Sequence, residues 1–126
     1  MSEGPEIVLV DTDHPIEPEE ISRLTDLFFK DMVKYVVDVE RRVGAIGGEL
    51  HADAEEMLLE AGSRQQDLWG ANYYPQKEPD ERIEYTSLIN IRPGQGNRGM
   101  LIEDPSVRER VRELTLALIR TEKSAK

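Results

Sequence analysis

The residues best suited to chemistry lie together at positions 87–100, where an apolar segment runs into a loop rich in glycine, arginine and side-chain amides. The polar and glycine residues of this loop are Asn90, Arg92, Gly94, Gln95, Gly96, Asn97, Arg98 and Gly99. Glycine lets the backbone turn where a side chain would clash and exposes its amide N–H groups, and arginine adds a fixed positive fork. This combination predicts a binding site for an anion.

A second interpretation of the same loop is purely structural. Glycine, proline and asparagine after a strand are ordinary turn residues. The loop does not match the G-x-x-x-x-G-K-[ST] motif that cradles phosphates, because Met100 stands where that motif has lysine. The two arginines could also pair with carboxylates of this acidic chain. Both interpretations stay open.

Polar residues outside the loop extend the candidate site. Asn72 could share a polar strand face with Asn90 and Arg92. Glu49 and His51 precede a predicted helix and are candidate acid–base neighbours of a bound molecule. In this hypothesis, a small anionic or phosphorylated ligand is bound by Asn72, Asn90, Arg92, Gln95, Asn97 and Arg98.

The same region offers a set of potential metal ligands, namely Glu49, His51, Asp53 and Glu55. Together they would suit a hard ion bound through oxygen. A helix start explains Asp53 and Glu55, and pairing with Lys34 explains Glu49, so we predict no metal and no cofactor.

Nucleophilic catalysis is not predicted from the sequence. The chain has no cysteine, which excludes disulfides and thiol chemistry. Ser87 falls within a predicted strand, and no G-x-S-x-G turn is present. The 26 acidic residues always allow some carboxylate pair, so acid–base chemistry, and with it the question whether the protein is an enzyme, stays open.

Composition limits the classes of partner. The chain has 126 residues and a formal net charge of −10, which opposes non-specific binding to nucleic acid and to anionic membranes. The first residues lack the basic and apolar regions of a signal peptide, and no apolar run approaches the roughly 20 residues that span a bilayer. We therefore expect a soluble, cytoplasmic protein with no nucleic-acid or membrane partner.

The elements that must position the candidate residues follow from the apolar pattern. Residues 7–10 form an apolar, β-branched run, which predicts a buried strand. Glu17-Pro18 opens a helix, because proline suits the first helical position. Its apolar stripe consists of Ile21, Leu24, Phe28 and Met32.

Residues 33–40 and 43–51 predict a hairpin around Arg41-Arg42. With Val37 opposite Ile46, one face is apolar and the other carries the opposite-charge pair of Lys34 and Glu49. Two arginines suit a tight turn poorly, so a wider loop is also considered.

Three more signals complete the chain. Asp53 with Glu56 three residues later predicts a helix start, and Gly62 predicts its end. Residues 66–74 and 82–92 predict a second hairpin, with Trp69, Tyr73 and Tyr74 in the core. Asp104-Pro105 starts a last helix, whose buried stripe is Val107, Val111, Leu114 and Leu118.

The predicted order is therefore β-α-β-β-α-β-β-α. This order favours a single α+β domain at residues 7–120, with a mainly antiparallel sheet and about three helices packed on it. A polar lead at 1–6 precedes it, and residues 121–126 are expected to fray.

Several strings in these elements resemble a known family. They are Val37-Asp38-Val39-Glu40, Gly48-Glu49-Leu50-His51-Ala52-Asp53-Ala54-Glu55, Asp67-Leu68-Trp69-Gly70-Ala71-Asn72 and Ile89-Asn90-Ile91-Arg92-Pro93-Gly94-Gln95-Gly96-Asn97-Arg98. Over residues 17–120 the chain is similar to a family of small uncharacterised prokaryotic proteins, a domain of unknown function. The resemblance implies no activity and no catalytic residue.

Two functions follow from these observations. One is a non-catalytic interaction or binding module, which could form a homodimer through a sheet edge or an apolar helix face. The other is a protein, binding or catalytic, that takes a small anion or phosphorylated metabolite in the loop from Asn90 to Arg98. The first is slightly favoured, because no recognised catalytic set is present.

Overall fold

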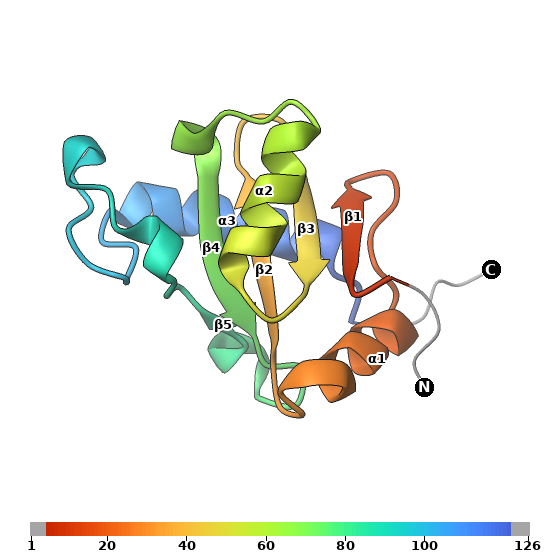
Figure 1. Cartoon of the computed structure of the whole chain (residues 1–126). Helices are drawn as coiled ribbons and strands as arrows, with labels where there is room; N and C mark the ends of the chain where they lie inside the picture. The colour runs from red at the N-terminus through yellow and green to blue at the C-terminus, as the bar shows by residue number, and fades with distance from the viewer. Residues whose placement is uncertain (1–4, 122–126) are drawn as a thin grey trace.

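The computed structural model describes residues 5–121 and contains a five-stranded antiparallel sheet with three α-helices (Figure 1). The elements are β1 (Ile7–Asp11), α1 (Pro18–Phe28), β2 (Val33–Asp38), β3 (Val43–Gly47), α2 (His51–Glu60), β4 (Leu68–Tyr73), β5 (Ile83–Glu84) and α3 (Pro105–Leu118). Short 3-10 turns are η1 (Gln65–Asp67), η2 (Pro79–Glu81), η3 (Leu88–Asn90) and η4 (Pro93–Gln95). The predicted α+β class, element order and antiparallel sheet are confirmed.

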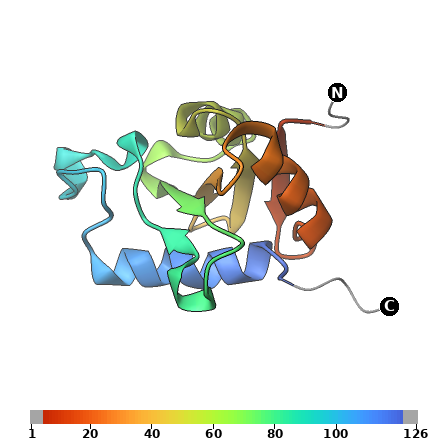
Figure 2. The same cartoon turned by 90° about the horizontal axis from the view of Figure 1, so that it is seen from below.

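The sheet is covered on both faces, with strand order β1-β3-β2-β4-β5. Figures 1 and 2 show α2 on one side of the strands and α3 on the other. Leu24 of α1 and Leu114 of α3 pack in one core with Tyr35 and Ile46, whereas Leu58 of α2 packs in a second, smaller core. No helix within residues 5–121 is long and apolar enough to cross a bilayer.

The predicted chain ends fall largely outside the described residues. Only residues 5 and 6 of the polar lead at 1–6, and only Thr121 of the expected frayed end at 121–126, are described. The boundaries of the predicted domain therefore stay a prediction.

β1 lies at an edge of the sheet, and the predicted burial of this strand is wrong. Only Val10 is buried, while Leu9 is exposed. An edge strand has one strand neighbour, so an apolar run can be half-covered there, which periodicity does not reveal.

The hairpin of β2 and β3 forms, but its register differs from the predicted one by two residues. Val37 pairs with Gly44 instead of Ile46. The reason is a four-residue turn at 39–42, in which the Asp38 carboxylate accepts the backbone N–H groups of Glu40 and Arg41, each at 2.9 Å. A shift of two residues keeps every side chain on its predicted face.

The second face of this hairpin, predicted to carry an opposite-charge pair, is a packing surface for α2. Val36 and Ala45 are buried there beneath Ala54 and Leu58 of α2. β3 ends at Gly47 and its register is shifted by two residues, so Glu49 does not lie opposite Lys34 and the predicted pair does not form.

α2 begins at His51, three residues before the start predicted with Asp53 as N-cap, and the residue preceding it, Leu50, provides no side-chain cap. Asp53 therefore lies in the first turn and is not the N-cap. Gly62, with φ of 109°, follows the helix end as predicted. Because of this early start, His51 is the first residue of the helix, and its side chain lines a cavity described below.

The predicted strand at 82–92 is wrong beyond Glu84. β5 has two residues, which pair with β4 through Asn72↔Glu84 and Tyr73↔Ile83. Farther along β4, the side chain of Asn90 takes the place of a strand: Gly70 N–H donates to Asn90 Oδ1 and Asn90 Nδ2 donates to Gly70 O, both at 2.9 Å. A side-chain amide has the donor and acceptor of a peptide group, so the backbone here is free to turn.

α3 forms as predicted from its sequence signals. The Asp104 side chain accepts the N–H of Ser106 at 2.8 Å and caps the helix. Of the predicted buried stripe, Val111, Leu114 and Leu118 are buried against the sheet, whereas Val107 is only half-buried.

Candidate functional site

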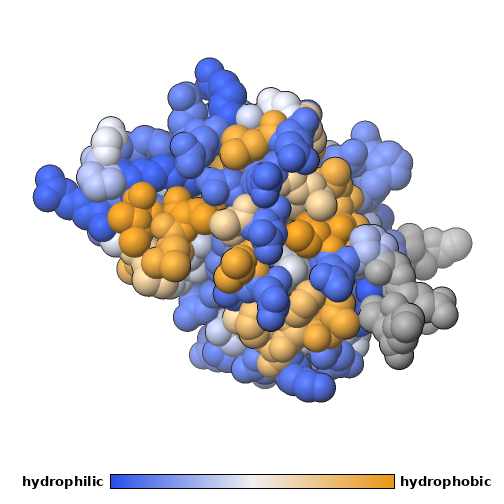
Figure 3. Space-filling view, in the orientation of Figure 1, coloured by the Kyte–Doolittle hydropathy of each residue, from blue (hydrophilic) through white to orange (hydrophobic). Residues whose placement is uncertain are grey.

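A cavity of about 510 Å³ opens between the start of α2, the paired ends of β4 and β5, and η3. Its apolar lining consists of Met32, Leu50, Ala52, Leu88, Ile89 and Met100. Its polar lining consists of Lys34, His51, Asn72, Glu84, Thr86 and Ser87. Figure 3 shows apolar side chains gathered over the segment around η3, on the left of the view.

Asn72 is the least satisfied polar residue of this cavity. The strand register places it opposite Glu84, and its Nδ2 donates to Glu84 Oε1 at 2.8 Å and to Thr86 O at 3.4 Å. The residue is only 7% exposed, yet its carbonyl oxygen Oδ1 has no hydrogen-bond partner within the described part of the chain. A buried acceptor without a partner costs free energy, so this atom is the strongest local indication of a ligand.

His51 contributes a second acceptor. Its Nε2 lies 2.9 Å from the carbonyl oxygen of Ala71, which can only accept, so Nε2 carries the hydrogen. Burial lowers the pKa of the imidazole, and Lys34 lowers it further, against the raising effects of Ala71 O, Asn72 and Glu84. The ring is therefore neutral at pH 7, with an unprotonated Nδ1.

The cavity holds one acidic and one basic side chain, whose formal charges cancel. Glu84 Oε1 accepts from Asn72 and from the Tyr74 hydroxyl, the latter at 3.1 Å. The Lys34 ammonium lies 5.0 Å from the centre of the Phe29 ring. Ser87 Oγ accepts the Ile89 N–H at 3.2 Å and caps η3. The free acceptors thus belong to an otherwise largely apolar cavity.

Arg92, the central residue of the predicted anion loop, is bound to the protein's own backbone. Its guanidinium donates to the carbonyls of Ile89 at 3.0 Å, Gln65 at 2.8 Å and Leu68. It also stacks over the Trp69 ring at 4.6 Å. Burial lowers the pKa of Arg92, a shift that Glu55 opposes. These contacts join η1, the start of β4 and η3.

Asn97 has a similar role. Its Nδ2 donates to the carbonyls of Asn90, Gly99 and Leu101 at 2.8, 2.9 and 3.1 Å. Its Oδ1 accepts the N–H of Glu103 at 2.9 Å. The side chain is buried with every donor and acceptor used, and it holds the loop closed on itself.

The remaining predicted residues lie at the surface. Gln95 is exposed and donates to Gln66 O at 3.1 Å. Arg98 is exposed and has no partner among the described residues, and Glu49 is exposed and does not line the cavity. The structure thus brings Asn72 and His51 together, while Asn90, Arg92 and Asn97 hold the loop.

The predicted reason for three glycines in the loop holds at one of them. Gly96 has φ of 85°, in the left-handed region, whereas a side chain added at Gly94 would meet no atom within 4 Å.

The potential metal ligands at 49–55 do not converge on one point. Within residues 5–121, no three histidine, aspartate or glutamate side chains are placed to share an ion.

Sequence reasoning missed part of the cavity. Glu84 and Thr86 fall on the same strand face as Asn90 in the period-2 pattern, so a signal for them existed. Leu50, Leu88 and Met100 come from segments far apart in the chain, and no local pattern links them.

Comparison with known proteins supports the resemblance seen in the sequence. Residues 9–118 match the model of a family described as Protein of unknown function (DUF5674). Searches of curated proteins and of solved structures each found no match. The match covers most of the chain and confirms the predicted relation to an uncharacterised family. The chain therefore belongs to the DUF5674 family.

Proposed function

We propose that the protein is a binding protein whose ligand is a small, largely apolar molecule with an N–H or O–H group, held in the cavity between α2, β4 and η3. The observation that carries this proposal is the buried carbonyl oxygen of Asn72, which has no partner within residues 5–121. A ligand donor would satisfy this atom and remove a penalty of about 1–3 kcal/mol.

The composition of the cavity supports the same ligand class. Five large apolar side chains surround a few polar atoms, which is the usual make-up of small-molecule sites. The volume of about 510 Å³ falls within the range of about 300–1,000 Å³ for such sites. Nδ1 of His51, neutral at pH 7, offers a second acceptor to the same ligand, and it would be the base if the ligand is also a substrate.

A matched pair of probes tests the proposal. Phenol and anisole have the same ring, but methylation removes the hydroxyl donor of phenol. We expect phenol to shift the amide resonances of the cavity residues at lower concentration than anisole. Equal binding of the two probes, or shifts outside the cavity, would contradict the proposed role of the acceptors.

Variants of Asn72 and His51 test whether the binding of phenol depends on these two acceptors. Asn72→Leu removes the carbonyl, and His51→Gln keeps a donor for Ala71 O while removing Nδ1. Each is expected to weaken phenol binding about fivefold, the loss of one hydrogen bond. Arg98→Gln, an exposed residue that does not line the cavity, is the control and should bind phenol as the wild type does.

A second candidate is the interaction module, and the exposed apolar side chains at the cavity mouth favour it. Among the residues that line the cavity, Leu88 is 70% exposed, Leu50 56% and Met100 42%. A protein partner, including a second copy of the chain, would cover them. Sedimentation over a range of concentrations distinguishes the candidates: a mass that rises with concentration and is restored to the monomer by Leu88→Asp favours the interaction module.

A further inference from the structure

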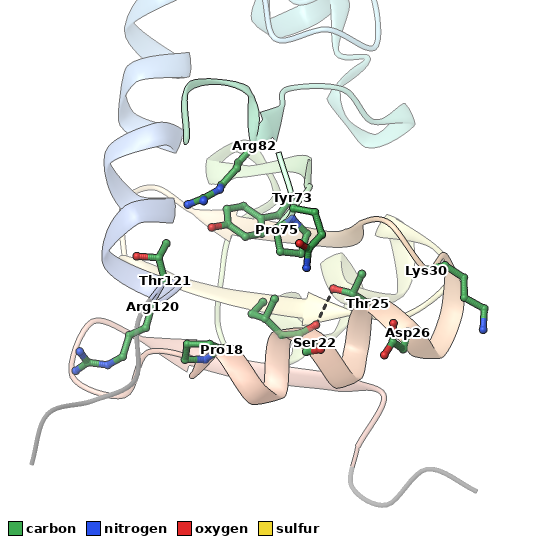
Figure 4. Close-up of a pocket in the computed structure, with 12 residues that line it drawn as sticks. Pro18, Ser22, Thr25, Asp26, Lys30, Tyr73, Pro75, Arg82, Arg120 and Thr121 are labelled. Atoms are coloured by element: carbon green, nitrogen blue, oxygen red, sulfur yellow. Dashed lines mark hydrogen bonds between the residues drawn. The ribbon is translucent and has the colours of Figure 1, made fainter. Parts of the chain in front are cut away.

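A second hollow lies on the α1 side of the sheet (Figure 4). It offers hydrogen-bond donors and positive charge, whereas the cavity at His51 offers acceptors. It has a volume of about 220 Å³ and lies between α1 and the connection from β4 to β5. Pro18, Ile21 and Pro75 provide apolar walls, and Tyr73 and Arg82 lie at one end.

The Tyr73 hydroxyl is a donor that lacks an acceptor. The residue is 4% exposed, and burial raises its pKa, although the neighbouring Arg82 opposes the shift. A guanidinium has only N–H donors, so Arg82 cannot accept the hydroxyl hydrogen. No other residue of the described chain accepts it, which leaves an O–H donor on the wall of the hollow.

Arg82 is held in place through its Nε and lies beside the Tyr73 hydroxyl. Its Nε donates to the carbonyl of Lys77 at 2.9 Å, which orients the guanidinium. The two terminal amino groups meet no carboxylate or carbonyl within residues 5–121. Figure 4 shows this guanidinium and the Tyr73 hydroxyl at the same end of the hollow, above the Thr121 hydroxyl.

The side chains around the hollow have a net positive charge, although the whole chain is strongly negative. Lys30, Arg82 and Arg120 line it with a single acid, Asp26, so the lining has a formal charge of 3 − 1 = +2, whereas the chain has −10. Arg120 pairs with Glu17 at 3.1 Å, and Lys30 points outward in Figure 4. Arg82 is therefore the cation that a molecule in the hollow would meet.

We propose that this hollow binds a small organic carboxylate, with the carboxylate oxygens accepting from Arg82 and Tyr73 and a compact apolar group against Pro18, Ile21 and Pro75. Arginine pairs with planar oxyanions through two parallel hydrogen bonds, which favours a carboxylate at this end. The apolar walls favour an organic acid over an inorganic anion. The site is independent of the cavity at His51.

The test compares benzoate with benzamide, its uncharged analogue, and with inorganic phosphate, by calorimetric titration of the full chain. We expect benzoate to bind, benzamide to bind at least about tenfold more weakly, and phosphate to lie between them. Phosphate binding as tight as benzoate would overturn the organic class, and absence of benzoate binding would overturn the site.

Two variants and a control assign the binding to these side chains. Tyr73→Phe keeps the buried ring and should bind benzoate about fivefold more weakly, at an unchanged melting temperature. Arg82→Gln should bind it about tenfold more weakly. Arg98→Gln removes one exposed charge outside the hollow and should have no effect. An equal loss in Arg98→Gln, or no loss in Tyr73→Phe, would show general charge attraction and contradict the proposal.

Discussion

Arg92 and His51 show how burial changes what a polar side chain can do. The guanidinium of Arg92 donates to backbone carbonyls of its own chain, and these hydrogen bonds hold η1 and η3 together. His51 uses Nε2 in the same way, while its Nδ1 is an unprotonated acceptor at a residue that lines a cavity. A polar residue whose donors and acceptors are all bonded within the protein is structural, whereas one with an unused donor or acceptor is a candidate for binding a ligand.

The first prediction concerns Arg92. We expect Arg92→Ala to lower the free energy of unfolding by about 3 kcal/mol, because bonds to charged groups contribute about 1.5–3 kcal/mol and the carbonyls lose their donor. Denaturant unfolding measures the change. Arg98→Ala, which removes an exposed arginine without a partner, should change it by no more than about 0.5 kcal/mol. Similar losses in both variants would argue against the structural role.

The second prediction concerns the pH dependence that His51 gives to folding. Its pKa in the folded protein lies below the ordinary value of 6.5, so the unfolded chain binds more protons between the two values. The stability from this group is complete above about pH 6.5 and is lost as the pH falls toward the folded pKa. Unfolding at several pH values between about 5 and 7 should show a shallower dependence in His51→Gln than in the wild type. Identical slopes would contradict the lowered pKa.

At the scale of elements, η3 replaces part of an edge strand. The Asn90 side chain pairs with both backbone groups of Gly70, and this brings Ser87 and Ile89 onto β4 as a wall of the cavity. The close approach requires glycine at position 70, because an added Cβ would lie 2.8 Å from Ser87 Cβ and 3.1 Å from Ile89 Cγ1.

The third prediction compares two glycines. Gly70→Ala should cost about 2 kcal/mol, because Ser87 Cβ is attached to backbone and cannot move aside alone. It should also shift the amide resonances of η3. Gly94→Ala meets no atom within 4 Å and should be neutral or stabilise the protein by up to about 1 kcal/mol. The expected contact between η3 and β4 is disproved if the two variants have equal melting temperatures.

At the scale of the whole molecule, two layers of unequal size cover the sheet. The core under α1 and α3 is large, whereas the core under α2 contains only Val36, Ala45, Ala54, Leu58 and Leu68. α2 also presents His51 to the cavity, so the packing of this thin layer and the geometry of the candidate site depend on each other.

The fourth prediction tests this dependence with adjacent leucines of α2. Leu58 is fully buried, and Leu58→Ala should cost about 3 kcal/mol through lost contacts and the cavity left behind. It should also increase hydrogen exchange along α2. Leu59 is 40% exposed, and Leu59→Ala should cost less than about 1 kcal/mol. Equal costs would mean that the second core contributes little to stability.

Local signals were sufficient for much of the fold. The Asp104-Pro105 cap, the apolar stripe of α3 and the alternation in β2 and β3 each depend on residues close in sequence, so the sequence by itself determined these elements, the α+β class and the family. It also singled out His51 and Asn72 as residues of interest.

Tertiary structure alone decided which polar groups are left without partners. Asn90 acts as a strand partner for Gly70, and Arg92 donates to carbonyls 24 and 27 positions earlier in the chain, those of Leu68 and Gln65. Such pairings depend on distances between segments remote in sequence, which residue types and spacing do not contain. For this physical reason the predicted loop site and the free acceptors of the cavity lie in different places.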